Sequence, residues 1–203
     1  MCSSDLRDAD EFERRDLDEF LRLIAQQSAE LSYIVEDLLV AARADDNEIP
    51  IHPEMIDLQA TVRHVIDGQH ISGDERIPLD AVEDVTGFAD PLRVRQIVRN
   101  LLTNATRYGG ADVRVGVEMT DRGPAVVVSD DGAGVASGEE QSIFEAYQRA
   151  SGGRLVPESV GLGLAVSRQL ARSMGGELRY QRRTERTEFV LELPPTVGVS
   201  RIG

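Results

Sequence analysis

The chain has 203 residues, of which 41% are hydrophobic, so it can form one buried core with an appendage or two small domains. Its formal net charge of -14 disfavours nonspecific nucleic-acid binding, and no stretch approaches the about 20 apolar residues that span a bilayer. All 22 basic residues are arginines, which excludes a lysine-dependent phosphate loop. Cys2 is the single cysteine, which excludes an internal disulfide framework and predicts a reducing compartment.

The N-terminal quarter of the sequence predicts one long helix. Residues 1–6 resemble the translation of a sequencing-adapter end, and we expect them to be a non-native scar on a truncated reading frame. From Asp16 to Arg43, seam residues recur at steps of three and four, as in a heptad repeat. We expect this seam to need a partner helix or a second chain, although a lone helix packed on its own domain stays open. The seam residues are Leu17, Leu21, Ile24, Ser28, Leu31, Val35, Leu38 and Ala42.

Beyond a linker at 45–49, the pattern alternates between strands and helices. Helices are predicted at 58–65 with Asp57 as N-cap, from Asp90-Pro91 to about Arg107, and at 162–174 before Gly175-Gly176. A long irregular stretch at 132–160 is unusual in a compact domain unless it has a function. Strands are predicted at 48–51, 77–80, 85–89, 113–119, 125–129, 177–180 and 188–193.

The helix that begins after Asp90 carries two amides and an arginine on one face. Asn100, Asn104 and Arg107 are spaced four and three residues apart, and asparagine is a poor helix former. An asparagine carbonyl can ligate Mg²⁺, and an arginine one turn later can meet a phosphate. Taken alone, the pattern also fits solvent-exposed asparagines.

Three further segments have residue types suited to a nucleotide. Asp130-Asp-Gly-Ala-Gly134 puts a carboxylate at a strand end, where it can accept from an exocyclic amine, although an ordinary Asp-Gly turn stays open. Gly161-Leu-Gly163 opens a helix whose N–H groups can seat a phosphate, although close helix packing is the alternative. In the long loop, Phe144 and Tyr147 can pin a segment from which Arg149 points at an anion.

Together these segments resemble the catalytic, ATP-binding domain of sensor histidine kinases of two-component systems, in the histidine-kinase, gyrase and chaperone ATPase superfamily. Residues 90–108 look like the N box, 130–134 the G1 box, 143–149 the F box and 161–166 the G2 box. The likeness spans about 50–193, and 33–43 resembles the second helix of the preceding dimerisation domain.

The resemblance implies an α/β fold, namely an α+β two-layer sandwich. We expect a mixed sheet of about five strands with about three helices on one face, preceded by the long N-terminal helix. The implied organisation is a second dimerisation helix at 7–44 whose first helix is missing, the linker, a catalytic domain at 50–194 with a lid at 132–160, and a tail at 195–203.

Carried over by position, the resemblance implies an adenine pocket at the G1 box. Asp130 would accept a hydrogen bond from the adenine amine, and Gly132 and Gly134 would line the nucleotide edge. Tyr108 would lie against the adenine ring. The implied cofactors are ATP and Mg²⁺.

The implied phosphate end of the site is built from the N, F and G2 boxes. Asn104 would be the Mg²⁺ ligand with Asn100 beside it, Arg107 would touch phosphate, and Arg149 would reach the γ-phosphate. Ser159-Val160 departs from the family's usual Gly-Thr and puts a hydroxyl contact there in doubt. Four residues would close over the triphosphate: Gly161, Leu162, Gly163 and Leu164.

The resemblance implies transfer of the γ-phosphate to a histidine absent from this chain, and from there to a response regulator. Asn100 stands where the superfamily's ATPases and serine kinases carry a glutamate base, and a neutral imidazole acceptor needs no such base. Catalysis would rest on Asn100, Asn104 and Arg149. The alternatives are an ATPase or serine kinase of the same superfamily and a non-catalytic ATP-binding module.

The implied partners are a second copy in a homodimer and a response regulator, with no nucleic acid and no membrane segment in this fragment. We expect a cytoplasmic location, with the full-length protein anchored in the inner membrane.

The 203-residue chain is expected to bind ATP without phosphorylating itself. None of His52, His64 and His70 has the surroundings of a phosphoacceptor, and we interpret all three as structural or surface residues. Incubation of the purified chain with γ-labelled ATP checks this expectation. Incorporation of acid-labile phosphate would contradict it.

Overall fold

The computed structural model describes residues 17, 20–21, 23–25, 27–28, 31–42, 49–68, 77–81, 84–145 and 161–195. The chain divides into two compact units, Met1–Ala42 and Arg43–Gly203. In the first unit, residues 31–42 and the described residues before them are helical, as predicted. Leu31, Val35 and Leu38 of the predicted seam are between 42% and 63% exposed, so the seam is not buried within the described chain. The need for a helical partner stays a prediction.

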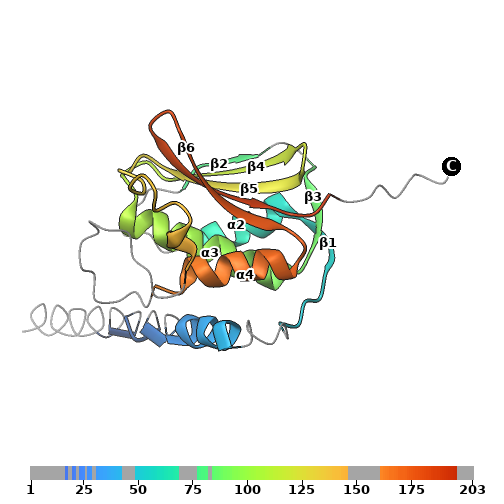
Figure 1. Cartoon of the computed structure of the whole chain (residues 1–203). Coiled ribbons are helices and arrows are strands. Elements are labelled where there is room, and N and C mark those ends of the chain that lie inside the picture. Colours follow the sequence, from blue (N-terminus) through green and yellow to red (C-terminus); the bar gives the residue numbers. More distant parts are fainter. Residues whose placement is uncertain are drawn as a thin grey trace, which may run out of the picture. The chain divides into compact units, whose positions relative to one another are not determined.

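The second unit contains three α-helices and a short 3-10 helix among its described residues (Figure 1). These helices are α2 (Leu58–Gly68), α3 (Pro91–Tyr108), α4 (Gly163–Ser173) and η1 (Ser142–Phe144). The strands are β1 (Glu54–Asp57), β2 (Leu79–Ala81), β3 (Thr86–Ala89), β4 (Arg114–Thr120), β5 (Gly123–Asp130), β6 (Glu177–Arg183) and β7 (Arg186–Glu192).

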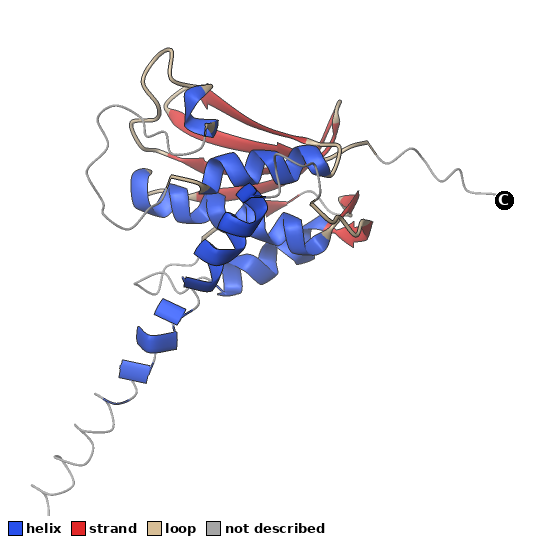
Figure 2. Cartoon of the chain, turned by 60° about the horizontal axis from the view of Figure 1, so that its bottom comes forward, coloured by secondary structure: helices blue, strands red, loops and turns tan. Residues whose placement is uncertain are grey.

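Five of the strands form one mixed sheet in the order β2-β4-β5-β7-β6. β2 runs parallel to β4 and the other neighbours are antiparallel, while β1 and β3 form a separate two-stranded sheet. α2, α3 and α4 lie on one face of the five-stranded sheet (Figure 1), and turning the molecule brings them in front of the strands (Figure 2). The predicted fold class is therefore confirmed.

The core lies between the sheet and the three helices. Because side chains alternate along a strand, β4, β5 and β7 send every second residue toward the helices. α3 meets them with an apolar stripe that is fully buried. Buried members of this core include Val115, Val117, Val126, Val128, Phe189, Leu191, Val94, Ile97, Leu101 and Leu102.

Asp90 fixes the start of α3. Its Oδ1 accepts hydrogen bonds from the backbone N–H groups of Leu92 at 2.9 Å and Arg93 at 3.3 Å, which satisfies two donors of the first turn. Its Oδ2 accepts from the backbone N–H of His52 at 2.9 Å. The predicted N-cap is confirmed, and it also ties the segment before β1 to the helix.

The predicted strand at 48–51 is wrong, because residues 49–51 are not in a strand and β1 begins at Glu54. The reason is backbone chemistry: Pro50 and Pro53 have no N–H to contribute to a ladder. Pairing therefore starts directly after Pro53, where Glu54 faces Ala89 of β3. The other predicted elements are present with ends shifted by a few residues.

Leu102→Ala should lower the free energy of unfolding by about 2 to 5 kcal/mol, because it removes a buried side chain and leaves a cavity. Leu102 is 0% exposed, whereas Leu92 of the same helix is 54% exposed. Leu92→Ala is the matched control and should change the free energy by less than about 0.5 kcal/mol. Urea unfolding followed by circular dichroism checks both, and equal losses would contradict this account of the core.

Candidate functional site: two helices and a strand end

Three of the predicted motifs are connected through α3. Gly109 follows α3 directly, and a Cβ added there would lie 2.7 Å from Cγ of Asp130. Asn100 in the middle of α3 reaches Gly163 at the start of α4. The N, G1 and G2 boxes, which are separated in sequence, are therefore joined in the fold.

Asn100 connects the two helices through its amide. Its Nδ2 donates to the carbonyl oxygen of Gly163 at 3.4 Å and to Oγ of Ser167 at 3.3 Å. Ser167 is fully buried, so its hydroxyl needs a partner inside the protein. A carboxylate at position 100 could not donate either bond. The amide therefore has a structural reason to be here.

Asn104, Arg107 and Tyr108 continue along α3 toward the strand end. Asn104 and Arg107 are half-buried, and Tyr108 is 45% exposed. Within the described part of the chain, no hydrogen bond is made by the side chain of Asn104. Its amide oxygen can therefore ligate a metal ion without first breaking a protein contact.

Asp130 is the buried charge of the site. It is 3% exposed, and its Oδ1 accepts from the backbone N–H of Gly132 at 2.9 Å. Burial raises the pKa of the Asp130 carboxyl above its ordinary value of 3.8, while the backbone N–H groups of Gly132 and Gly110 oppose that rise. Such a carboxylate strongly favours a further hydrogen-bond donor, and an adenine amine is one.

The G1 turn is closely packed around its glycines. Gly134 has φ at 74°, in the left-handed region that glycine tolerates. A Cβ there would contact Arg182 and would come within 3.0 Å of the Tyr180 hydroxyl and 3.1 Å of Thr187 Oγ1. Glycine is needed at this position by both conformation and space.

The F box is fastened to α4 by Arg168. The Arg168 guanidinium lies 4.7 Å from the Phe144 ring centroid and also donates to Oε1 of Gln141 at 3.3 Å. Its Nε donates to Oε1 of Glu177 at 2.9 Å. Burial pushes the pKa of Glu177 up, but the bonds and charges of Arg168 and Arg172 outweigh it, so the pKa is lowered. Tyr147, Arg149 and Ser159-Val160 lie outside the described residues.

Comparison with known proteins identifies the family. The model of the histidine kinase-, DNA gyrase B- and HSP90-like ATPases matches residues 89–197, which is more than half of the chain. The chain belongs to this ATPase family. The matched range contains the helix, strand end and glycine turn described above, which confirms the predicted resemblance.

Relatives and solved structures of this ATPase family point to sensor kinases. The signal transduction histidine-protein kinase AfsQ2 of Streptomyces coelicolor is 30% identical over 175 residues, which are 86% of this chain and 32% of that protein. Full-length ShkA in complex with AMPPNP has 25% identity and a TM-score of 0.65 over 92% of this chain and 40% of that one. The Acinetobacter baumannii histidine kinase AdeS, at 23% identity, shares the fold with a TM-score of 0.68, over 87% of this chain and 84% of that one.

The chain spans about a third of the length of the curated relatives that it matches. None of its described helices combines the length and the apolar character needed to cross a membrane.

Several residues of this candidate site were not predicted from the sequence. Thr187 of β7 faces Asp130 across the ladder and is 4% exposed, yet a threonine in a strand is unremarkable in sequence. Gly109 and Gly110 pass against Asp130 and Asp131, and their signal was a glycine pair directly after the helix. The arginines of the β6–β7 hairpin carried no local signal, because a basic strand usually faces solvent.

The face of the sheet opposite the helices differs in character among the described residues. A hollow of about 490 Å³ lies there, lined by residues of β4, β5, β6 and β7. Several of its charges are paired: Arg122 and Arg179 both form ion pairs with Glu192, and Arg183 forms one with Glu188. It is a surface of exposed ion pairs, each of which contributes little.

Asp130→Asn should weaken ATP binding by about 10- to 100-fold, because a hydrogen bond to a charged group contributes roughly 1.5–3 kcal/mol. Isothermal titration of the chain with ATP measures this loss. The fold should persist without nucleotide, as Asn can still accept from Gly132. Unchanged affinity would contradict the assigned role of Asp130.

The pH dependence of stability should differ between the wild-type chain and the Asp130→Asn variant. Because the fold raises the pKa of Asp130, the folded chain holds this proton more tightly than the unfolded chain, and the ionised form opposes folding. The Asp130→Asn variant lacks this penalty. Its melting temperature should therefore exceed that of the wild-type chain by the largest amount near neutral pH. The advantage should shrink as the pH falls toward 3.8. An advantage that grows on acidification would contradict the shift.

Proposed function

We propose that this chain is the ATP-binding catalytic domain of a sensor histidine kinase, which transfers the γ-phosphate of Mg-ATP to a histidine. The observation that carries the proposal is a pair of contacts made by the amide-bearing helix α3: its end packs against the buried strand-end carboxylate Asp130, and Asn100 bonds Gly163 at the start of the glycine-opened helix. The family match supports ATP as the nucleotide, and the related ShkA was crystallised with the ATP analogue AMPPNP.

The adenine end of the site is assigned to Asp130. Its carboxylate accepts hydrogen bonds and cannot donate them when ionised, so it suits the 6-amino group of adenine. Gly132 and Gly134 allow the backbone to approach the nucleotide, and exposed Tyr108 can lie against the ring. A carboxylate in this role favours adenine over guanine, because guanine has a carbonyl oxygen in place of the 6-amino group.

The phosphate end is assigned to the start of α4. The N-cap residue Leu162 makes no side-chain bond to the first turn, whereas Asp90 caps α3 with two. The first N–H groups of α4 are therefore without a capping side chain, and phosphate oxygens are suitable acceptors for them. Gly161, Leu162, Gly163 and Leu164 are proposed to close over the triphosphate, with Arg107 and Arg149 on phosphate oxygens.

Mg²⁺ fits the residues of this candidate site. Among the described residues there is no cluster of three or more His, Cys, Asp or Glu side chains that could hold a metal ion. Mg²⁺ usually takes one or two protein ligands, with waters and substrate phosphates completing its shell. Asn104, through its amide oxygen, is the proposed protein ligand. The ion would neutralise charge on the transferring phosphoryl group.

Histidine is favoured as the acceptor because position 100, where the superfamily's ATPases and serine kinases carry a glutamate base, holds an asparagine. Asn100 cannot take a proton, and its amide is already used as a donor to Gly163 and Ser167. A neutral imidazole nitrogen has a lone pair available and needs no deprotonation. Hydrolysis or transfer to serine would require a general base at this position.

The proposed organisation follows the relatives, which are sensor kinases of which this chain matches about a third of the length. Residues 7–44 would be the second dimerisation helix of a homodimer, 45–49 a linker, and 50–194 the catalytic domain with its lid at 132–160. The phosphohistidine would pass its phosphate to a response regulator. The domain would lie in the cytoplasm, where ATP is available, in a protein anchored in the inner membrane.

Asn104→Ala should abolish Mg²⁺-dependent strengthening of ATP binding and phosphotransfer to a separate dimerisation domain that carries an acceptor histidine. The wild-type chain should phosphorylate that domain in trans, measured as acid-labile, base-stable phosphate. Thr106→Ala is the control, since Thr106 lies two residues on and its hydroxyl bonds the Leu102 carbonyl of its own helix. Nucleotide binding by wild type without any transfer would favour the non-catalytic alternative.

A further inference from the structure

The β6–β7 hairpin carries two arginines that contact opposite sides of the Asp130 segment. Arg182 faces Thr187 in the β6–β7 register, and Thr187 in turn faces Asp130. Arg186 begins β7 and contacts Ser129, the residue before Asp130. Because side chains alternate along strands, Asp130 and Ser129 point to different faces of the sheet. The two arginines therefore support the site from both faces.

Arg182 holds the G1 turn, residues 130–134, through the carbonyl oxygen of Gly132. Its Nη1 donates to the Gly132 carbonyl oxygen at 3.0 Å and to Oγ1 of Thr187 at 3.0 Å. The N–H of the same Gly132 residue donates to Asp130. Tyr180, on the same strand as Arg182, accepts from the backbone N–H of Val135 at 3.0 Å. The turn that supplies one N–H to Asp130 is thus fixed by side chains of β6.

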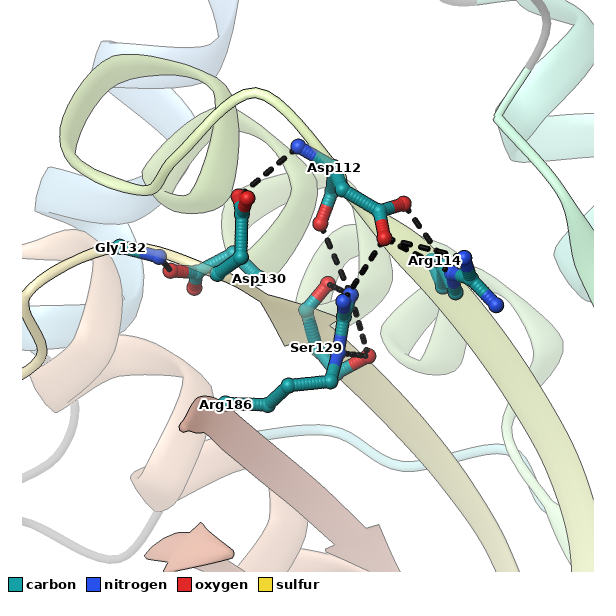
Figure 3. A network of polar contacts seen from close by, with 7 residues as sticks. Asp112, Arg114, Ser129, Asp130, Gly132 and Arg186 are labelled. Atoms are coloured by element: carbon teal, nitrogen blue, oxygen red, sulfur yellow. Dashed lines mark hydrogen bonds and ion pairs between the residues drawn. The ribbon is translucent and has the colours of Figure 1, made fainter. Parts of the chain in front are cut away.

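Arg186 holds the loop between α3 and β4 (Figure 3). Its Nη1 donates to Oδ2 of Asp112 at 2.8 Å and its Nη2 to the carbonyl oxygen of Asp112 at 2.8 Å. Arg114 bonds the same carboxylate, and the N–H of Asp112 donates to Oδ1 of Asp131 at 2.8 Å. This loop contains Gly110, whose N–H is the second donor to Asp130.

The Arg186–Asp112 pair contributes more through the direction of its hydrogen bonds than through the attraction between its charges. The side chains of Arg186 and Asp112 are 28% and 39% exposed, so their attraction is screened by water. A two-pronged guanidinium contact to a carboxylate and a carbonyl nevertheless fixes direction. Hydrogen bonds from Arg114 first, and then from Arg186, lower the pKa of Asp112.

We propose that Arg182 and Arg186 are positioning residues for base recognition, holding the two backbone segments whose N–H groups orient the Asp130 carboxylate. The inference rests on the proposed role of Asp130 in reading adenine. A carboxylate oriented by two donors presents a fixed acceptor to the 6-amino group and repels the carbonyl oxygen of guanine. When either segment is released, the carboxylate can rotate, and the preference for adenine falls.

The test measures dissociation constants of the full chain for ATP and GTP. Arg182→Met and Arg186→Met should each weaken ATP binding about tenfold, the scale of one lost hydrogen bond in a desolvated site, and leave GTP binding unchanged. The ATP-over-GTP ratio should therefore fall about tenfold. Arg183→Met is the matched control: Arg183 lies in the same hairpin, its side chain is 71% exposed, and both dissociation constants should stay at wild-type values.

Conservative substitutions separate positioning from stability. Arg182→Lys should restore most of the selectivity, because one ammonium can still reach the Gly132 carbonyl. Arg186→Lys should not, because a single point donor cannot bond the Asp112 carboxylate and carbonyl together. Asp112→Asn combined with Arg186→Met should lose less selectivity than the sum of the two single changes, since the contact between the Asp112 carboxylate and Arg186 is already lost in Arg186→Met. Thermal unfolding identifies variants that are folded and can be compared.

Each result has a defined meaning. If wild type binds ATP and Asp130→Asn loses it, but folded Arg182→Met and Arg186→Met keep the wild-type ATP-over-GTP ratio, the inference is overturned while the proposed function stands. Equal weakening of ATP and GTP also overturns it, because that pattern reflects a general loss of structure. If wild type itself binds no ATP, the proposed function fails first.

Discussion

A buried carboxylate at the end of a central strand organises this molecule. Ionised Asp130 has almost no contact with solvent, so its charge must be met by donors that the fold supplies. Gly132 supplies one from the same strand end, and Gly110 supplies another from the end of α3. The close approach of α3 to β5, with no room for a side chain at Gly109, follows from this requirement.

The rest of the site depends on how α3 is held. Asp90 fixes its beginning, and Asn100 ties its middle to Gly163, so the uncapped start of α4 faces the helix that carries Asn104. Helix α3 and strand β5 thus carry the groups that we propose to read the base and to bind the metal ion. The N–H groups that we propose to bind phosphate lie at the start of α4, where no side chain caps the helix.

Much of this arrangement was predictable from local sequence, because its signals are local. Asp90-Pro91 encodes a helix start, the amide spacing encodes one helix face, and Gly175-Gly176 encodes a helix end. What escaped prediction depends on register between distant strands. Thr187 and Arg186 come close to the Asp130 segment only when β7 pairs with β5. The first strand begins later than predicted because Pro50 and Pro53 have no N–H to donate to a neighbouring strand.

The most direct test of the account is a magnetic-resonance titration of the ¹⁵N-labelled chain with Mg-AMPPNP. The account predicts that the backbone amides of Gly132 and Gly163 and the side-chain amide of Asn104 shift together, with one shared dissociation constant, because they line a single pocket. Shifts confined to the opposite face of the sheet, or different dissociation constants for these three groups, would contradict it.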